Sequence, residues 1–166
     1  LTLGCFLNPE FTLGQSSISD NPNTITFILV RHAEKADNSP NTNLSEAGKS
    51  RAQALAKLLS KVKVDAIYTT SLNRTQQTAQ WVAEQNNLKI QTYDMDSKFP
   101  TMTDKLAKKH AGKTILIVGH SNTLPVNIAR LTKKELSIPE SEFDNLFIVN
   151  LYDDDTTQLL QLKYGD

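Results

Sequence analysis

Two stretches of the sequence share one form, and together they decide the fold. Residues 24–32 read TITFILVRH, and residues 114–120 read TILIVGH. Each begins as an apolar run rich in β-branched residues, which is typical of a strand buried on both faces. Each ends on a histidine, His32 or His120. Because the carboxyl ends of parallel strands meet at one edge of a sheet, we expect both histidines in one crevice there.

The surrounding segments alternate between strand and helix patterns. Strands are predicted over residues 24–30, 66–69, 88–93, 114–118, 146–151 and 158–163, and helices over 46–62, 74–85, 103–110 and 124–131. This alternation predicts an α/β fold, a three-layer sandwich whose mostly parallel central sheet is flanked by helices. The last two strands, joined by the polar turn 153–155, are predicted to form an antiparallel hairpin at one edge.

Individual residues within the helices carry further expectations. Ser45 is predicted to cap the first helix. Trp81, beside Val82 and Ala83, is expected to pack into the core. His110 follows two lysines at a helix end, where a positive charge would complement the helix dipole, so we interpret it as structural.

Composition excludes several classes of protein. The chain has 166 residues, 39% of them hydrophobic, and its 18 basic and 18 acidic residues cancel. This length fits one domain, and a neutral chain is not expected to be a dedicated nucleic-acid binder. A single cysteine, Cys5, cannot form an internal disulfide. No apolar run reaches the ~18 residues that a membrane-spanning helix needs.

The amino-terminal stretch differs from the remainder. Residues 1–14 read LTLGCFLNPEFTLG and precede a polar stretch. This pattern is typical of the apolar part of a secretory leader. We therefore expect residues 1–23 to be a leader remnant or flexible arm, residues 24–166 to form the working domain, and the protein to be extracytoplasmic, periplasmic or secreted. The alternative is a packed arm on a cytoplasmic protein.

Arginines accompany the two histidines. Arg31 directly precedes His32, and Arg74 opens the helix after the strand at 66–69, which places it near the same sheet edge. Two guanidiniums and two imidazoles would form a cationic pocket in a neutral chain. Arginine binds phosphate oxygens with two parallel hydrogen bonds, so the pocket is predicted to hold a phosphate.

Four motifs in these segments resemble those of the histidine phosphatase superfamily, which includes phosphoglycerate mutases and acid phosphatases. Arg31-His32-Ala33-Glu34 resembles its RHG signature, with alanine in place of glycine. Residues 44–48 (LSEAG) resemble the start of its first helix. Residues 70–79 (TSLNRTQQTA) resemble its second arginine motif, and residues 118–122 (VGHSN) its second histidine motif. The resemblance covers residues 24–166 and implies a small, single-domain, phosphoglycerate mutase-like member.

The resemblance implies a role for each matched residue. His32 would attack phosphorus and form a phosphohistidine. Arg31, Arg74 and His120 would hold the three equatorial oxygens. Asn38, seven positions after Arg31, would contact phosphate, or it is a plain turn residue. The resemblance implies no metal and no cofactor.

The proton donor for the leaving group stays open. One branch of the family uses an acid between the second arginine and the second histidine. The other uses an aspartate directly after that histidine, where this chain has Ser121. Asp94 and Asp96, just after the third strand, are the candidates, and Glu34 beside the nucleophile is a third.

These observations favour a metal-independent phosphatase that hydrolyses phosphomonoesters. The expected partner is a small phosphorylated substrate. The segment between Arg74 and His120 is short and leaves little chain for a cap, which favours a phosphatase over a phosphoglycerate mutase. A second alternative is a non-catalytic phosphate- or protein-binding module that kept the pocket.

Overall fold

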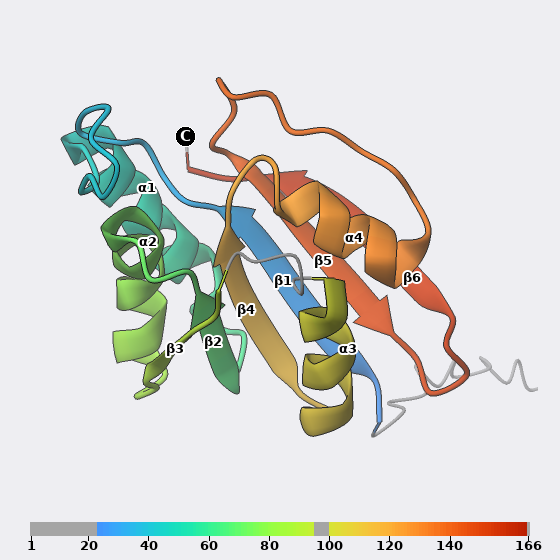
Figure 1. The fold of residues 1–166 in the computed structure, drawn as a ribbon. Helices are drawn as coiled ribbons and strands as arrows, with labels where there is room; N and C mark the ends of the chain where they lie inside the picture. Colours follow the sequence, from blue (N-terminus) through green and yellow to red (C-terminus); the bar gives the residue numbers. More distant parts are fainter. Residues whose placement is uncertain (1–22, 95–99, 166) are drawn as a thin grey trace, which may run out of the picture.

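One mixed sheet runs through the centre of the protein (Figure 1). The computed structural model describes residues 23–94 and 100–165. In this part of the chain, the sheet has six strands in the order β3-β2-β4-β1-β5-β6. The strands are β1 (Ile25–Arg31), β2 (Ala66–Thr69), β3 (Ile90–Thr92), β4 (Thr114–Gly119), β5 (Asn145–Leu151) and β6 (Thr157–Lys163). The first four run parallel, and β5 and β6 form an antiparallel hairpin at one edge, as predicted.

Helices cover both faces of the sheet, which confirms the three-layer α/β sandwich. The helices are α1 (Glu46–Leu58), α2 (Asn73–Gln85), α3 (Pro100–Lys109) and α4 (Leu124–Thr132). Helices α1 and α2 lie on one face, and α3 and α4 on the other (Figure 1). Ile28 and Val30 of β1 pack into the α1/α2 layer, whereas Phe27 and Leu29 pack into the α3/α4 layer. Strand β1 is therefore apolar throughout because it is buried on both faces.

Helix α1 begins where the sequence predicts and ends early. The Ser45 side chain accepts a hydrogen bond from the Gly48 amide and so caps the helix, as predicted. The helix ends at Leu58 rather than at Val62. Beyond it, the Ser60 amide bonds to the Lys57 carbonyl, a tighter i→i+3 turn that redirects the chain towards β2.

The prediction that Trp81 packs into the core is wrong. Its side chain is 45% exposed, whereas its neighbours Val82 and Ala83 are buried. Successive helical residues are rotated by about 100°. The buried face of α2 is set by Ala79 together with Val82 and Ala83, so Trp81 falls at its margin.

His110 is structural, but not through the charge that the sequence suggested. It is buried, and its Nε2 lies 2.9 Å from the Tyr68 hydroxyl. Burial, with the nearby charges of Lys109 and Lys113, lowers the pKa of His110 below its ordinary value. The imidazole is therefore neutral at neutral pH, and its role is a buried polar contact between α3 and β2.

Some predictions fall on residues outside the described ranges. These are the leader-like residues 1–14 with Cys5, and the candidate acid Asp96. Within the described ranges, no helix has the length and apolar character to cross a membrane.

Gly48 brings α1 into direct contact with the segment that follows β1. A Cβ at this position would lie 2.3 Å from the Glu34 carbonyl oxygen, which is backbone and cannot give way cheaply. Helix α1 thus approaches the residues after His32 as closely as a glycine permits.

We predict that Gly48→Ala destabilises the protein by about 1–3 kcal/mol, because α1 must shift to admit one methyl group. Urea unfolding measures this change. Ala47→Ser, one position away on the exposed side, is the control and should change stability by less than about 0.5 kcal/mol. Equal midpoints for the two variants would show that the contact yields without strain.

Candidate active site

The register between β1 and β4 places the two strand-end histidines side by side. Arg31 pairs with Gly119 across the strands, and the His32 amide donates to the Gly119 carbonyl at 2.9 Å. The two strands thus end together, and the ring centroids of His32 and His120 lie 5.3 Å apart. Both rings are buried. The prediction that they share one site is confirmed.

His32 is held in one tautomer. Its Nδ1 lies 2.8 Å from the Ala33 carbonyl oxygen. A carbonyl can only accept, so Nδ1 carries the hydrogen and Nε2 keeps its lone pair. Burial, reinforced by the charges of Arg31 and Arg74, lowers the pKa of His32 to about 4. The ring is therefore a neutral nucleophile at neutral pH.

A chain of hydroxyls orients His120. Its Nε2 lies 3.1 Å from Thr70 Oγ1, which lies 2.9 Å from Thr75 Oγ1. The Thr75 hydroxyl donates to the Leu72 carbonyl at 2.7 Å, so each hydroxyl hydrogen points away from the ring. His120 Nε2 therefore donates, and Nδ1 is the ring nitrogen left for a ligand. Burial, together with His32, lowers the pKa of His120 to about 3.

The guanidinium of Arg31 is fixed by the connection between α4 and β5. It is 3% exposed and lies 4.1 Å above the ring of Phe143. Its Nη1 donates to three main-chain carbonyl oxygens, those of Pro139 (3.1 Å), Glu140 (2.7 Å) and Glu142 (3.0 Å). The cation is thus oriented before any ligand arrives.

Arg74 enters from the first turn of α2, and Thr78 fixes its spacing from β1. Arg74 Nη1 donates to the Pro40 carbonyl at 2.9 Å. The Thr78 hydroxyl accepts from the Ala33 amide at 2.9 Å and donates to the Arg74 carbonyl at 2.7 Å. The residue after the histidine is therefore tied directly to the turn that carries the second arginine.

Each of the two arginines has one buried donor that is unpaired within the described residues. The Nε atoms of Arg31 and Arg74 are buried and have no hydrogen-bond partner within the described residues. A buried, unsatisfied donor destabilises the fold by about 1–3 kcal/mol. Two such donors at one pocket are best explained by a ligand with several acceptor oxygens. The pocket between them has a volume of about 310 Å³. Its lining comprises Arg31, His32, Lys35, Arg74, His120, Ser121, Asn122 and Glu140.

Asn38 does not line this pocket, contrary to the phosphate contact proposed for it. The Asp37 carboxylate accepts from the Ser39 amide (2.7 Å) and hydroxyl (2.6 Å), which forms a tight turn. That turn leaves Asn38 exposed, with Lys35 Nζ 3.5 Å from its side-chain oxygen. The alternative of a plain turn residue describes it better.

The described candidate acids lie away from the pocket. The Glu34 carboxylate pairs with Arg51 of α1 at 2.7 Å, and Asp94 is exposed after β3. Within the described residues, the carboxylate that does line the pocket is Glu140, which the sequence reasoning missed. It follows Pro139 in an irregular connection, where no spacing or motif marks a functional residue.

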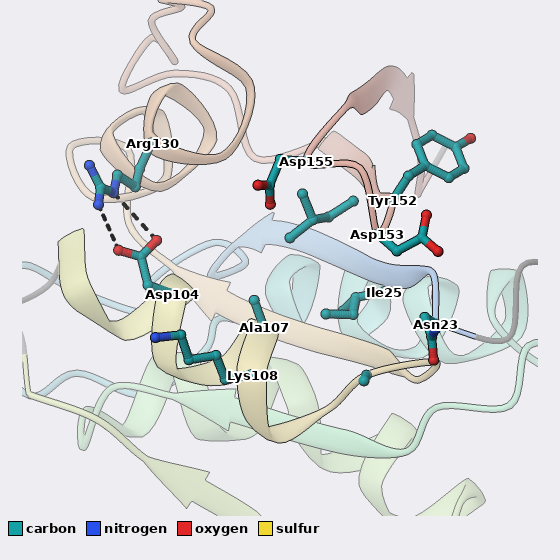
Figure 2. A pocket seen from close by; sticks show the side chains of 11 residues that line it. Asn23, Ile25, Asp104, Ala107, Lys108, Arg130, Tyr152, Asp153 and Asp155 are labelled. Atoms are coloured by element: carbon teal, nitrogen blue, oxygen red, sulfur yellow. Dashed lines mark hydrogen bonds and ion pairs between the residues drawn. The ribbon is translucent and has the colours of Figure 1, made fainter.

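A larger cavity, of about 580 Å³, lies at the opposite edge of the sheet. Figure 2 shows it between the start of β1 at Ile25 and the ion pair that joins Asp104 of α3 to Arg130 of α4. Asp153 and Asp155 add carboxylates to its wall. The three aspartates of this lining outnumber its two cations, Lys108 and Arg130, and Arg130 is already paired with Asp104. The smaller pocket, with two histidines and two arginines, suits a phosphate better and is the candidate active site.

The family comparison agrees with this geometry. Residues 27–95, which include His32 and Arg74, match the family model "Histidine phosphatase superfamily (branch 1)". Over that segment the chain is similar to the histidine phosphatase superfamily. His120 follows the matched range, and the β1–β4 pairing brings it to the same pocket.

Individual members of the histidine phosphatase superfamily are similar over parts of the chain. Phosphoserine phosphatase 1 of Hydrogenobacter thermophilus is 41% identical over 73 residues, which are 40% of this chain and 35% of that protein. Lipopolysaccharide core heptose(II)-phosphate phosphatase of Salmonella newport is 33% identical over 106 residues, which are 58% of this chain and 53% of that protein. The alignments thus span from about a third to about half of these relatives.

The solved structure of the protein histidine phosphatase SixA, complexed with tungstate, has the same fold. It superposes with a TM-score of 0.67 at 17% identity, covering 83% of this chain and 96% of that one.

We predict that the free energy of unfolding decreases as the pH falls from about 6.5 to about 4. The lowered pKa values mean that the unfolded chain binds more protons across this window, so stability is present above it and lost as the pH falls. The slope is at most about 1.4 kcal/mol per pH unit for each histidine. Urea unfolding at pH 7 and pH 5 measures it. His120→Asn should flatten the dependence, and an unchanged slope would contradict the assignment.

Proposed function

We propose that this chain is a metal-independent phosphatase that hydrolyses phosphomonoesters through a phosphohistidine on His32. One observation carries the proposal. The buried, unpartnered Nε donors of Arg31 and Arg74 flank a histidine whose Nε2 lone pair is free. A phosphoryl group supplies acceptor oxygens for the donors and an electrophilic phosphorus for the lone pair.

The geometry supports a two-step displacement. Nε2 of His32 attacks phosphorus, and the N–P bond forms as the bond to the leaving oxygen breaks. The Ala33 carbonyl, on Nδ1–H, stabilises the positive charge that develops in the ring. Arg31 and Arg74 offset the charge on the equatorial oxygens without moving, because main-chain carbonyls already hold them. Water then attacks phosphorus and releases His32.

His120 would act as the third oxygen holder. At neutral pH its Nδ1 carries no proton, because the pKa is about 3. A phosphate dianion beside the ring favours the charged form and raises that pKa. His120 would then take up a proton as the ligand binds and donate it, as a hydrogen bond from Nδ1, to a phosphoryl oxygen.

The substrates to test first follow from the relatives and from the pocket mouth. The relatives bear the names of phosphatases of phosphoserine and of a heptose phosphate, which points to phosphorylated amino acids and sugars. Exposed Lys35 and Asn122 line the mouth and can hydrogen-bond a polar leaving group. An extracytoplasmic location, proposed from residues 1–14, would favour sugar or lipid head-group esters over cytoplasmic phosphoproteins.

We expect turnover of p-nitrophenyl phosphate in the presence of EDTA. His32→Ala should abolish it, and Arg74→Gln should lower kcat/KM by about 10²-fold, as loss of one charge-stabilising donor typically does. Arg130→Gln is the matched arginine control. Arg130 lies in the opposite cavity and forms a half-exposed ion pair, so the Arg130→Gln variant should be as active as the wild type.

Three outcomes would contradict the proposal. Equal turnover by wild type and His32→Ala would place the nucleophile elsewhere. Phosphate binding with no turnover would indicate a binding module that kept the pocket. Transfer of the phosphoryl group within phosphoglycerate, rather than its release as inorganic phosphate, would instead identify a mutase.

Labelling with a ³²P-phosphomonoester should trap a phosphoenzyme that is labile in acid and stable in alkali, as a phosphorus–nitrogen bond requires. Peptide mapping should place the label on His32. His110→Asn, which removes a histidine outside the pocket, should still be labelled. An acid-stable adduct would contradict the phosphohistidine step.

A further inference from the structure

Glu140 occupies a distinctive place at the pocket. It lies on the connection between α4 and β5, and it is the one carboxylate among the described residues that line the pocket. Its Oε2 lies 2.6 Å from Arg31 Nη2, and its Oε1 accepts a hydrogen bond from the Ser121 hydroxyl. The carboxylate therefore bridges the residue before one site histidine and the residue after the other.

The main chain at Glu140 is fixed by Arg31, and its carboxylate is exposed to solvent. The carbonyls of Pro139, Glu140 and Glu142 all accept from Arg31 Nη1. The Glu140 side chain is 80% exposed, although that of its partner Arg31 is only 3% exposed. The connection thus holds a solvent-exposed carboxyl group at the mouth of the pocket.

A phosphoryl group bound to Arg31 would lie beside the Glu140 carboxylate. Because Nη1 of Arg31 is filled by carbonyls, an incoming oxygen can use only Nε and Nη2, and Nη2 already binds Glu140. The hydrogen bond from Ser121 and the charge of Arg31 lower the pKa of Glu140. A bound phosphate dianion brings like charge beside the carboxylate, which favours its protonated form.

The direction of attack points the leaving group towards Glu140. His32 is 4% exposed and lies at the pocket floor, where β1 and β4 end. In an in-line displacement the leaving oxygen departs on the side of phosphorus opposite the nucleophile. That side faces the mouth, where the exposed Glu140 carboxyl group lies.

We propose, resting on the phosphatase function above, that Glu140 is the proton donor to the leaving group. As the N–P bond to His32 forms and the P–O bond breaks, the leaving oxygen takes the proton of the Glu140 carboxylic acid. The resulting carboxylate then accepts a proton from the attacking water, whose oxygen bonds to phosphorus as the N–P bond breaks. Glu140 ends the cycle protonated, with phosphate in the pocket, and each step balances in atoms and charge.

The test compares two esters that differ in their need for a proton. The p-nitrophenolate of p-nitrophenyl phosphate leaves without one, whereas the alkoxide of glycerol 2-phosphate does not. Glu140→Gln keeps the shape of the side chain and removes the acid. We expect it to lower kcat/KM for glycerol 2-phosphate by about 10²-fold or more, and for p-nitrophenyl phosphate by less than about 10-fold.

Glu135→Gln is the matched control. It removes the same charge from the same connection, but Glu135 is exposed and does not line the pocket within the described residues. It should match the wild type on both esters. Thermal melting of both variants shows whether the connection still folds, and Glu140→Asp should recover part of the activity on the alkyl ester, because it restores an acid.

Each other outcome overturns the assignment. Equal losses on both esters would mean that Glu140 only positions Arg31, and gains on both would mean that it only competes with phosphate. A leaving-group effect in Asp94→Asn or Asp96→Asn, with none in Glu140→Gln, would move the role to that residue. If the wild type lacks turnover that depends on His32, the phosphatase function itself fails; a wild type that is active through His32 isolates the failure to Glu140.

Discussion

The parallel pairing of β1 with β4 is the constraint on which the site depends. It aligns Arg31 with Gly119 and so makes His32 and His120 neighbours. The register is fixed by burial. A slip of one residue would turn Phe27 and its alternate neighbours towards the wrong helical layer, because strand side chains alternate between faces. The core therefore enforces the spacing of the two histidines.

The remaining side chains are positioned by main-chain groups and short hydroxyl links. Carbonyls of the α4–β5 connection orient Arg31, and Thr78 ties the residue after His32 to the turn that carries Arg74. Thr70 sets the ring of His120. Such fixed dipoles need little rearrangement when charge develops on a ligand, which is the arrangement that electrostatic stabilisation requires. The two buried Nε donors left unpaired are the local cost of that preparation.

How far the sequence could predict the structure depended on the kind of signal. Both ends of strand β2 were predicted correctly, because a short apolar run between polar segments is typical of a buried strand. The end of α1 and the exposure of Trp81 were not, because both depend on where the helix must turn and which of its faces meets the sheet. The phosphate contact expected of Asn38 is not seen, because a turn closed by Asp37 holds Asn38 outside the pocket.

Local apolar patterns and residue order are enough to predict the α/β sandwich, the two strand-end histidines and the arginines beside them. Which carboxylate lines the pocket depends instead on how the chain folds. The Glu34 carboxylate forms an ion pair with Arg51 and lies outside the pocket. Glu140 lies on an irregular connection far along the chain and pairs with Arg31. No local sequence pattern predicts this position of Glu140. It results from the hydrogen bonds that Arg31 donates to three main-chain carbonyls of that connection, which is distant in sequence.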